Sequence, residues 1–146
     1  SLAPDRAGWG DDNRGTMIRV IAAPGDKNVR FENRVGEPAA NPYLYMASQV
    51  IAGLHGIQTK CDPGVPSREA YNDKREPLPR NLKEAVEALK QDTLYPKKMG
   101  ELFVDYIVRM KENEIRRYEA FIEKEKIKNH DDTVTDWEQR EYFEVF

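Results

Sequence analysis

The pattern of hydrophobic and polar positions changes at Asn41. Before it, two short β-rich segments, residues 16–23 and 28–35, are separated by a stretch that contains Pro24 and Gly25. Segments of this length and composition are typical of strands, and proline and glycine are typical of the turn that joins them. The first part of the chain is therefore predicted to form an antiparallel hairpin.

After Asn41 the period becomes helical. Asn41 followed by Pro42 is a typical helix start, because asparagine caps free N–H groups and proline at the first position loses no hydrogen bond. We expect this helix to run to about Gly56. It is apolar nearly all round, so we also expect further protein to cover it. A structured, proline-rich loop is predicted over residues 58–80.

The second half is expected to be helical. Asn81 is predicted to cap a short helix that ends at residues 92–96. Residues 97–127 carry a drifting apolar stripe among charged positions, which predicts one long helix. Thr135 is expected to cap a last helical turn within residues 133–146. Together these elements predict an α+β fold, in which a short antiparallel sheet is backed by several packed helices.

Composition and charge argue against a nucleic-acid-binding protein and against a membrane protein. The chain has 146 residues, 39% of them hydrophobic, and 23 basic against 26 acidic residues, for a net charge of −3. This length suits one domain with an adequate core. The chain has no basic excess and no apolar run long enough to cross a bilayer, so neither nucleic acid nor a membrane is an expected partner. Cys61 is the only cysteine, which favours a reducing, cytoplasmic location.

The charged residues that suggest chemistry lie on the predicted hairpin. Arg30, Glu32 and Arg34 alternate along the second strand, so their side chains should point to one face. Arg14 and Arg19 lie on or beside the first strand. Such a face is commonly just solvated, but it could also be a site where guanidinium groups bind phosphate or carboxylate and Glu32 holds Mg²⁺. Strand spacing alone does not choose between the two.

Three linked motifs run through this region. In chain order they are Asn13-Arg14 with Ile18-Arg19-Val20, then Arg30-Phe31-Glu32-Asn33-Arg34, then Glu37-Pro38-Ala39-Ala40-Asn41-Pro42-Tyr43-Leu44. The pattern resembles the C-terminal part of the glutamine synthetase family, where an NR-x4-R strand, an R-x-E-x-R strand and a D/E-P-A-A-N-P-Y-L turn lead into a helix. Order and spacing match throughout. Val35-Gly36 departs from the family's usual lead-in to this turn, which hints at a divergent branch that joins glutamate to other amines.

The resemblance implies a chemistry and a role for each charged residue. The reaction would be ATP-dependent ligation of glutamate to ammonia or another amine through a γ-glutamyl phosphate. Arg14 and Arg19 would contact the nucleotide phosphates and the transferred phosphoryl group, and Arg30 would face ATP. Glu32 would be a ligand of Mg²⁺ or Mn²⁺, and Arg34 would bind glutamate. Phosphoryl transfer depends mainly on positioning and charge neutralisation, which arginine and a divalent metal supply.

The resemblance also implies that this chain is incomplete as an enzyme. The family's other metal ligands and its glycine-rich ATP signature lie upstream, and neither is found here. We therefore expect residues 1–146 to be a single partial domain, the C-terminal fragment of the catalytic domain, which is inactive alone. The family implies a homo-oligomer with active sites between subunits. Two other hypotheses stay open: a non-catalytic binding or scaffold protein that keeps the fold, and an unrelated helical interaction module whose charged hairpin is only solvated.

Overall fold

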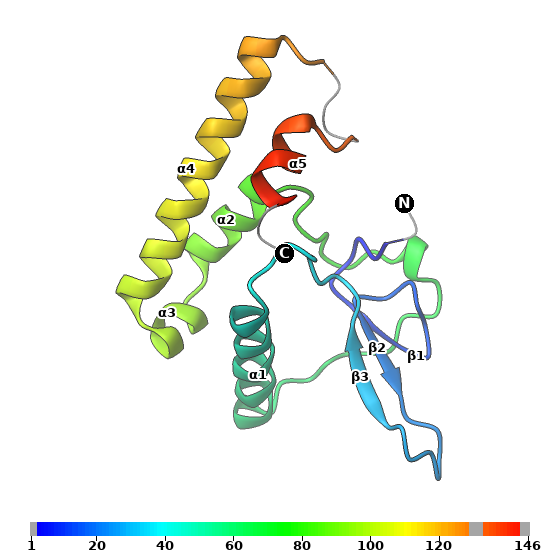
Figure 1. The fold of residues 1–146 in the computed structure, drawn as a ribbon. Helices are drawn as coiled ribbons and strands as arrows, with labels where there is room; N and C mark the ends of the chain where they lie inside the picture. Colours follow the sequence, from blue (N-terminus) through cyan, green and yellow to red (C-terminus); the bar gives the residue numbers. More distant parts are fainter. Residues whose placement is uncertain (1–2, 129–132, 144–146) are drawn as a thin grey trace. The chain divides into compact units, whose positions relative to one another are not determined.

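A computed structural model of the chain describes residues 3–128 and 133–143. They fall into two compact units, Ser1–Arg80 and Asn81–Phe146, which are described separately (Figure 1). That both units belong to one partial domain stays a prediction. In chain order the elements are β1 (Trp9–Asp11), β2 (Ile18–Ile21), β3 (Arg30–Asn33), α1 (Pro42–Thr59), a 3₁₀ turn η1 (Ala70–Asn72), α2 (Leu82–Gln91), α3 (Leu94–Met99), α4 (Glu101–Glu125) and α5 (Asp136–Phe143). The predicted α+β class is confirmed.

The sheet of the first unit has the strand order β1-β2-β3. Strands β2 and β3 are antiparallel, with Arg19 opposite Glu32, so the predicted hairpin is confirmed. The sheet is not antiparallel throughout, however, because β1 runs parallel to β2 with Trp9 opposite Ile18. Strand β1 has three residues, too few for alternation to reveal it in the sequence.

Helix α1 begins as predicted. The Asn41 Oδ1 atom accepts hydrogen bonds from the backbone N–H groups of Tyr43, at 3.0 Å, and Leu44, at 3.2 Å. The helix continues past Gly56 to Thr59 and ends at Lys60, which adopts a left-handed conformation with φ of 51°. Gly56 therefore lies within the last turns of the helix and does not end it.

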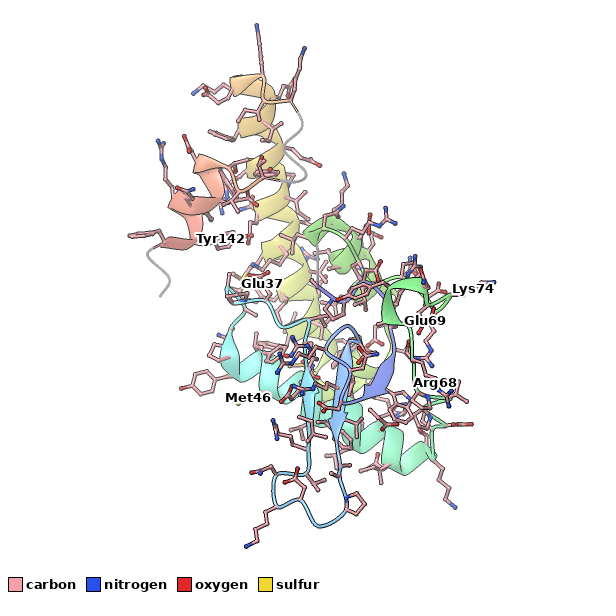
Figure 2. All side chains as sticks on the ribbon, turned by 90° about the vertical axis from the view of Figure 1, so that its right-hand side faces the viewer. Glu37, Met46, Arg68, Glu69, Lys74 and Tyr142 are labelled. Atoms are coloured by element: carbon pink, nitrogen blue, oxygen red, sulfur yellow. The ribbon has the colours of Figure 1, made fainter. Side chains whose placement is uncertain are left out.

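No residue of α1 is buried in this chain. Large apolar side chains are exposed along its length, and Figure 2 labels one of them, Met46. The exposed set is Tyr43, Met46, Val50, Leu54 and Ile57. That further protein covers this helix stays a prediction. None of the helices in the described residues combines the length and the apolarity that crossing a bilayer requires.

Helices α2 and α3 pack against α4 in the second unit (Figure 1). The capped start of α2 is confirmed, since the Asn81 Oδ1 atom accepts a hydrogen bond from the Glu84 N–H at 2.9 Å. The prediction of one long helix over residues 97–127 is wrong. Gly100, with φ of 101°, separates α3 from α4, a conformation that glycine adopts readily. Pro96 lies in the first turn of α3, where proline is tolerated, instead of ending a helix.

Helix α5 is capped and is tied to α4. The Thr135 N–H donates to Glu138 Oε2 at 2.7 Å and the Glu138 N–H donates to Thr135 Oγ1 at 3.3 Å, which is a capping box. The predicted cap at Thr135 is thus confirmed. Arg117 on α4 donates through Nη1 to Glu141 Oε2 on α5 at 3.0 Å. Residues 144–146 of the predicted tail lie outside the described residues.

A small valine core stabilises the second unit, and we expect Val104→Ala to weaken it. Val104 is 5% exposed and packs with Val86 and Val108. Because the substitution removes two buried methyl groups, the free energy of unfolding should fall by about 1–3 kcal/mol. Urea denaturation of the chain, followed by circular dichroism, measures this. Leu102→Ala is the control on the same helix, since Leu102 is 83% exposed; equal losses in both variants would contradict the expectation.

Candidate active site

The Asn-Arg motif forms a tight turn between β1 and β2. The Asn13 Oδ1 atom accepts a hydrogen bond from the Gly15 N–H at 3.0 Å, and Asn13 Nδ2 donates to the carbonyl oxygen of Ser67 at 3.3 Å. Thr16 is 3% exposed, and its hydroxyl lies 2.8 Å from the carbonyl oxygen of Asn13. Asparagine therefore shapes the turn and fastens it to the following loop, and Arg14 is presented at the turn with an exposed side chain.

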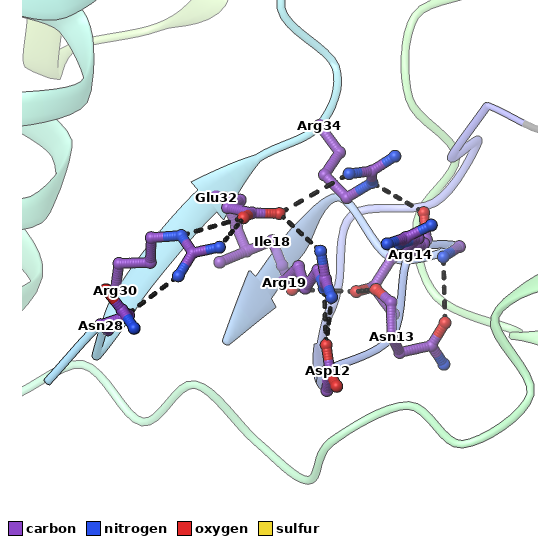
Figure 3. A network of polar contacts seen from close by, with 11 residues as sticks. Asp12, Asn13, Arg14, Ile18, Arg19, Asn28, Arg30, Glu32 and Arg34 are labelled. Atoms are coloured by element: carbon purple, nitrogen blue, oxygen red, sulfur yellow. Dashed lines mark hydrogen bonds and ion pairs between the residues drawn. The ribbon is translucent and has the colours of Figure 1, made fainter. Parts of the chain in front are cut away.

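Three arginines converge on Glu32, as Figure 3 shows. Arg19 and Glu32 are directly opposite on β2 and β3, and Arg19 Nη1 donates to Glu32 Oε2 at 3.0 Å. Arg30 lies on the same strand as Glu32, and its Nη2 atom is 2.8 Å from Oε1. Arg34 directly follows that strand, and its Nη1 atom is 3.7 Å from Oε2. Both carboxylate oxygens are thus in ion pairs. The alternation seen in the sequence does place these side chains on one face.

The cluster becomes more exposed from Arg19 outward. The exposed fraction of the side chain is 14% for Arg19, 25% for Glu32 and 48% for Arg30. Partial burial acts to raise the pKa of Glu32, but hydrogen bonds from Arg19 and Arg30 outweigh it and the pKa lies below its ordinary value. Glu32 is therefore a carboxylate at neutral pH, and its charge is shared among the arginines around it.

Arg14 and Arg34 meet through the backbone of the turn. Arg34 Nε donates to the carbonyl oxygen of Arg14 at 2.8 Å (Figure 3). Within the described part of the chain, the guanidinium of Arg14 has no ion pair. All five predicted site residues thus lie in one region, with Arg14 connected to it by its main chain. What each of them binds stays a prediction.

Asp12 belongs to the cluster and was missed by reasoning from the sequence. Its Oδ1 atom accepts from Arg19 Nε at 2.8 Å and also from Arg19 Nη2. The hydrogen bonding that Arg19 donates to Asp12 is the main cause that raises the pKa of Arg19, against the effect of burial. One signal in the sequence could have suggested Asp12, because it is an acidic residue directly before the Asn-Arg motif. Its reach to Arg19, however, depends on the parallel pairing of β1 with β2, which the hydrophobic pattern does not show.

The cluster suits a divalent metal only as part of a larger site. Glu32 offers the oxygen ligand that Mg²⁺ and Mn²⁺ prefer. In the residues that the structure describes, no group of three or more His, Cys, Asp or Glu side chains could hold a metal ion. A divalent metal at Glu32 would therefore need further oxygen ligands from outside the described residues.

Comparison with known proteins gives a consistent result across the whole chain. The glutamine synthetase catalytic domain matches residues 1–130. The chain is 45% identical to gamma-glutamylanilide synthase of Acinetobacter sp., over 99% of this chain and 29% of that protein. It is 35% identical to glutamine synthetase of Halobacterium salinarum, over 99% of this chain and 31% of that one. It is also 34% identical to gamma-glutamylethanolamide synthetase of Streptomyces coelicolor, over 99% of this chain and 28% of that one.

These relatives are much longer than the chain, which spans about a third of their length or less. The match nevertheless runs through the hairpin and the Asn-Arg turn, which build the arginine cluster, and through the capped start of α1. The chain belongs to the glutamine synthetase catalytic-domain family.

Proposed function

We propose that the chain is part of an ATP-dependent carbon–nitrogen ligase that joins glutamate to ammonia or another amine through a γ-glutamyl phosphate. The observation that carries this proposal is the convergence of Arg19, Arg30 and Arg34 on Glu32. Activation of a carboxylate by ATP brings several negative charges together, and arginine with a divalent metal neutralises them.

Each member of the cluster has a proposed role. Arg14 and Arg19 contact the nucleotide phosphates and the phosphoryl group in transfer. Arg30, the most exposed of the arginines paired with Glu32, faces ATP. Arg34 binds the substrate glutamate. Glu32 would help to hold Mg²⁺ or Mn²⁺, and the bound metal would supply positive charge that neutralises negative charge on the phosphates.

The names of the relatives point to two kinds of amine substrate, namely organic amines and ammonia. The relative at 45% identity is named for an anilide and another, at 34%, for an ethanolamide, whereas a relative at 35% is named a glutamine synthetase. We propose that this chain comes from the branch that makes γ-glutamyl amides of organic amines. The altered lead-in at Val35-Gly36, before the turn into α1, is in keeping with such a branch.

The rest of the site is proposed to come from outside these residues. A chain that spans 29% of its relative and supplies one metal-binding carboxylate should be inactive alone. We propose that it works within a longer subunit of a homo-oligomer. A reducing, cytoplasmic location is in keeping with Cys61, an exposed free thiol.

We expect the complete subunit to hydrolyse ATP only when both glutamate and an amine are present. The measurement is release of ADP and phosphate with ammonia, aniline and ethanolamine offered in turn, and with residues 1–146 alone as the inactive control. A hydroxamate trap for the acyl phosphate tests the intermediate. Absence of glutamate-dependent turnover with every amine would favour the alternative, a non-catalytic scaffold or binding protein that retains the fold.

A further inference from the structure

Arg19 is held from two opposite sides. Glu32 accepts from its Nη1 atom at 3.0 Å, and Asp12 accepts from its Nε atom at 2.8 Å and also from Nη2. Every nitrogen of the guanidinium thus has a carboxylate partner in the present arrangement. Arg19 is also the least exposed of the three arginines around Glu32, so its position is the most constrained.

The two carboxylates differ in how many partners they serve. Glu32 is shared by Arg19, Arg30 and Arg34, whereas the Asp12 side chain pairs with Arg19. Under the proposed function, Glu32 must also offer an oxygen to a metal that carries the nucleotide phosphates. An oxygen that ligates a metal is a weaker acceptor for arginine, so Arg19 then depends more on its second partner.

The backbone at Asp12 fixes where that partner lies. Asp12 follows β1 directly, and its N–H donates to the carbonyl oxygen of Val20 at 2.8 Å, which continues the parallel pairing. The residue has φ of 47°, a left-handed conformation in which aspartate and asparagine are among the better tolerated side chains. With the backbone in this conformation, the Asp12 side chain contacts Arg19 on the neighbouring strand β2.

We propose that Asp12 is a positioning residue that keeps the Arg19 guanidinium in place while Glu32 engages the metal–nucleotide complex. The proposal rests on the proposed function, and it adds a residue to the site. Asp12 acts through Arg19 and does not itself contact the phosphates. Its loss should therefore impair the steps that involve phosphate and leave glutamate binding, which is assigned to Arg34, unchanged.

The test compares Asp12→Asn with Asp11→Asn in the complete subunit. Both remove one negative charge from neighbouring exposed residues, and asparagine keeps the left-handed backbone of position 12. We expect Asp12→Asn to weaken Mg·ATP binding, measured by calorimetry, and to lower kcat, each by about tenfold. This is less than the roughly 10²-fold that a displacement of 1 Å can cost, because Glu32 still holds Arg19. The KM for glutamate should stay within about twofold, and Asp11→Asn should match the wild type.

A double-mutant cycle separates positioning from a general structural effect. If Asp12 acts through Arg19, Asp12→Asn should have less than about a twofold effect in an Arg19→Lys background. Asp12→Glu, which restores the charge, should recover part of kcat. Full additivity of the two substitutions, or equal behaviour of the Asp11 and Asp12 variants, would overturn the proposal.

The cycle can be read from Mg·ATP affinity alone. If the subunit shows no glutamate-dependent turnover, the proposed function is wrong, but Mg·ATP binding to the variants still tests the role of Asp12. In that case, equal Mg·ATP affinities of the Asp11→Asn and Asp12→Asn variants would overturn the role of Asp12 as well.

Discussion

Glu32→Gln in the complete subunit is expected to weaken Mg·ATP binding roughly 10²-fold and to reduce glutamate-dependent turnover by roughly 10²- to 10³-fold. Glutamine keeps the shape of the side chain but removes the charge that Arg19, Arg30 and Arg34 share. The three guanidinium groups then repel one another without a common partner, and a neutral amide is a poor ligand for Mg²⁺. Calorimetry with Mg·ATP and an ADP-release assay measure the two effects.

Glu76→Gln is the matched control, because Glu76 is an exposed glutamate of the same unit. It should leave binding and turnover unchanged. Thermal unfolding of both variants shows whether they fold. A folded Glu32→Gln variant with wild-type affinity for Mg·ATP would contradict the role of Glu32 as a metal ligand.

Arg19→Lys is expected to lower kcat roughly 10²-fold, although it conserves the charge. The fork of the guanidinium lets Arg19 bind Asp12 and Glu32 at once. A lysine ammonium is a point charge on a flexible chain and cannot span both carboxylates in this geometry. The nitrogen should therefore move away from the position at which phosphate charge develops.

Two comparisons make this expectation specific. Arg30→Lys should have a smaller effect, because Arg30 is 48% exposed and pairs, among the described residues, with the single carboxylate of Glu32. Arg68→Lys, at an exposed arginine in the loop beside the Asn-Arg turn, should match the wild type. Steady-state ADP release for the three variants gives the ranking. Equal losses for Arg19→Lys and Arg30→Lys would show that charge alone matters at position 19.

The charged hairpin could be predicted from the sequence because its information is local. Alternation places Arg30, Glu32 and Arg34 on one face of the predicted strand, residues 28–35, and the structure brings these three side chains together. The same holds for the helix start at Asn41, whose side chain caps the N–H groups of Tyr43 and Leu44, two and three residues later. Membership of the glutamine synthetase family also excludes the hypothesis of an unrelated helical interaction module.

The features that escaped prediction depend on contacts or on single backbone angles. Asp12 joins the cluster only because β1 pairs in parallel with β2, and a three-residue strand leaves no periodic trace. The break between α3 and α4 rests on the positive φ of Gly100, whereas the apolar stripe runs across it without interruption. In both places the local sequence pattern fitted a simpler structure: a two-stranded hairpin in the first case and one uninterrupted helix in the second.

The ion pairs that Arg19 and Glu32 make join residues that are close along the chain. The separation is 7 residues for Asp12 and Arg19, 13 for Arg19 and Glu32, and 2 for Arg30 and Glu32. Closing such short loops costs little chain entropy, so contacts of this kind form early and fast. By contrast, Asn13 reaches its partner Ser67 across 54 residues. The hairpin with its charged face should thus assemble first during folding, and the loop that fastens the Asn-Arg turn should dock onto it afterwards.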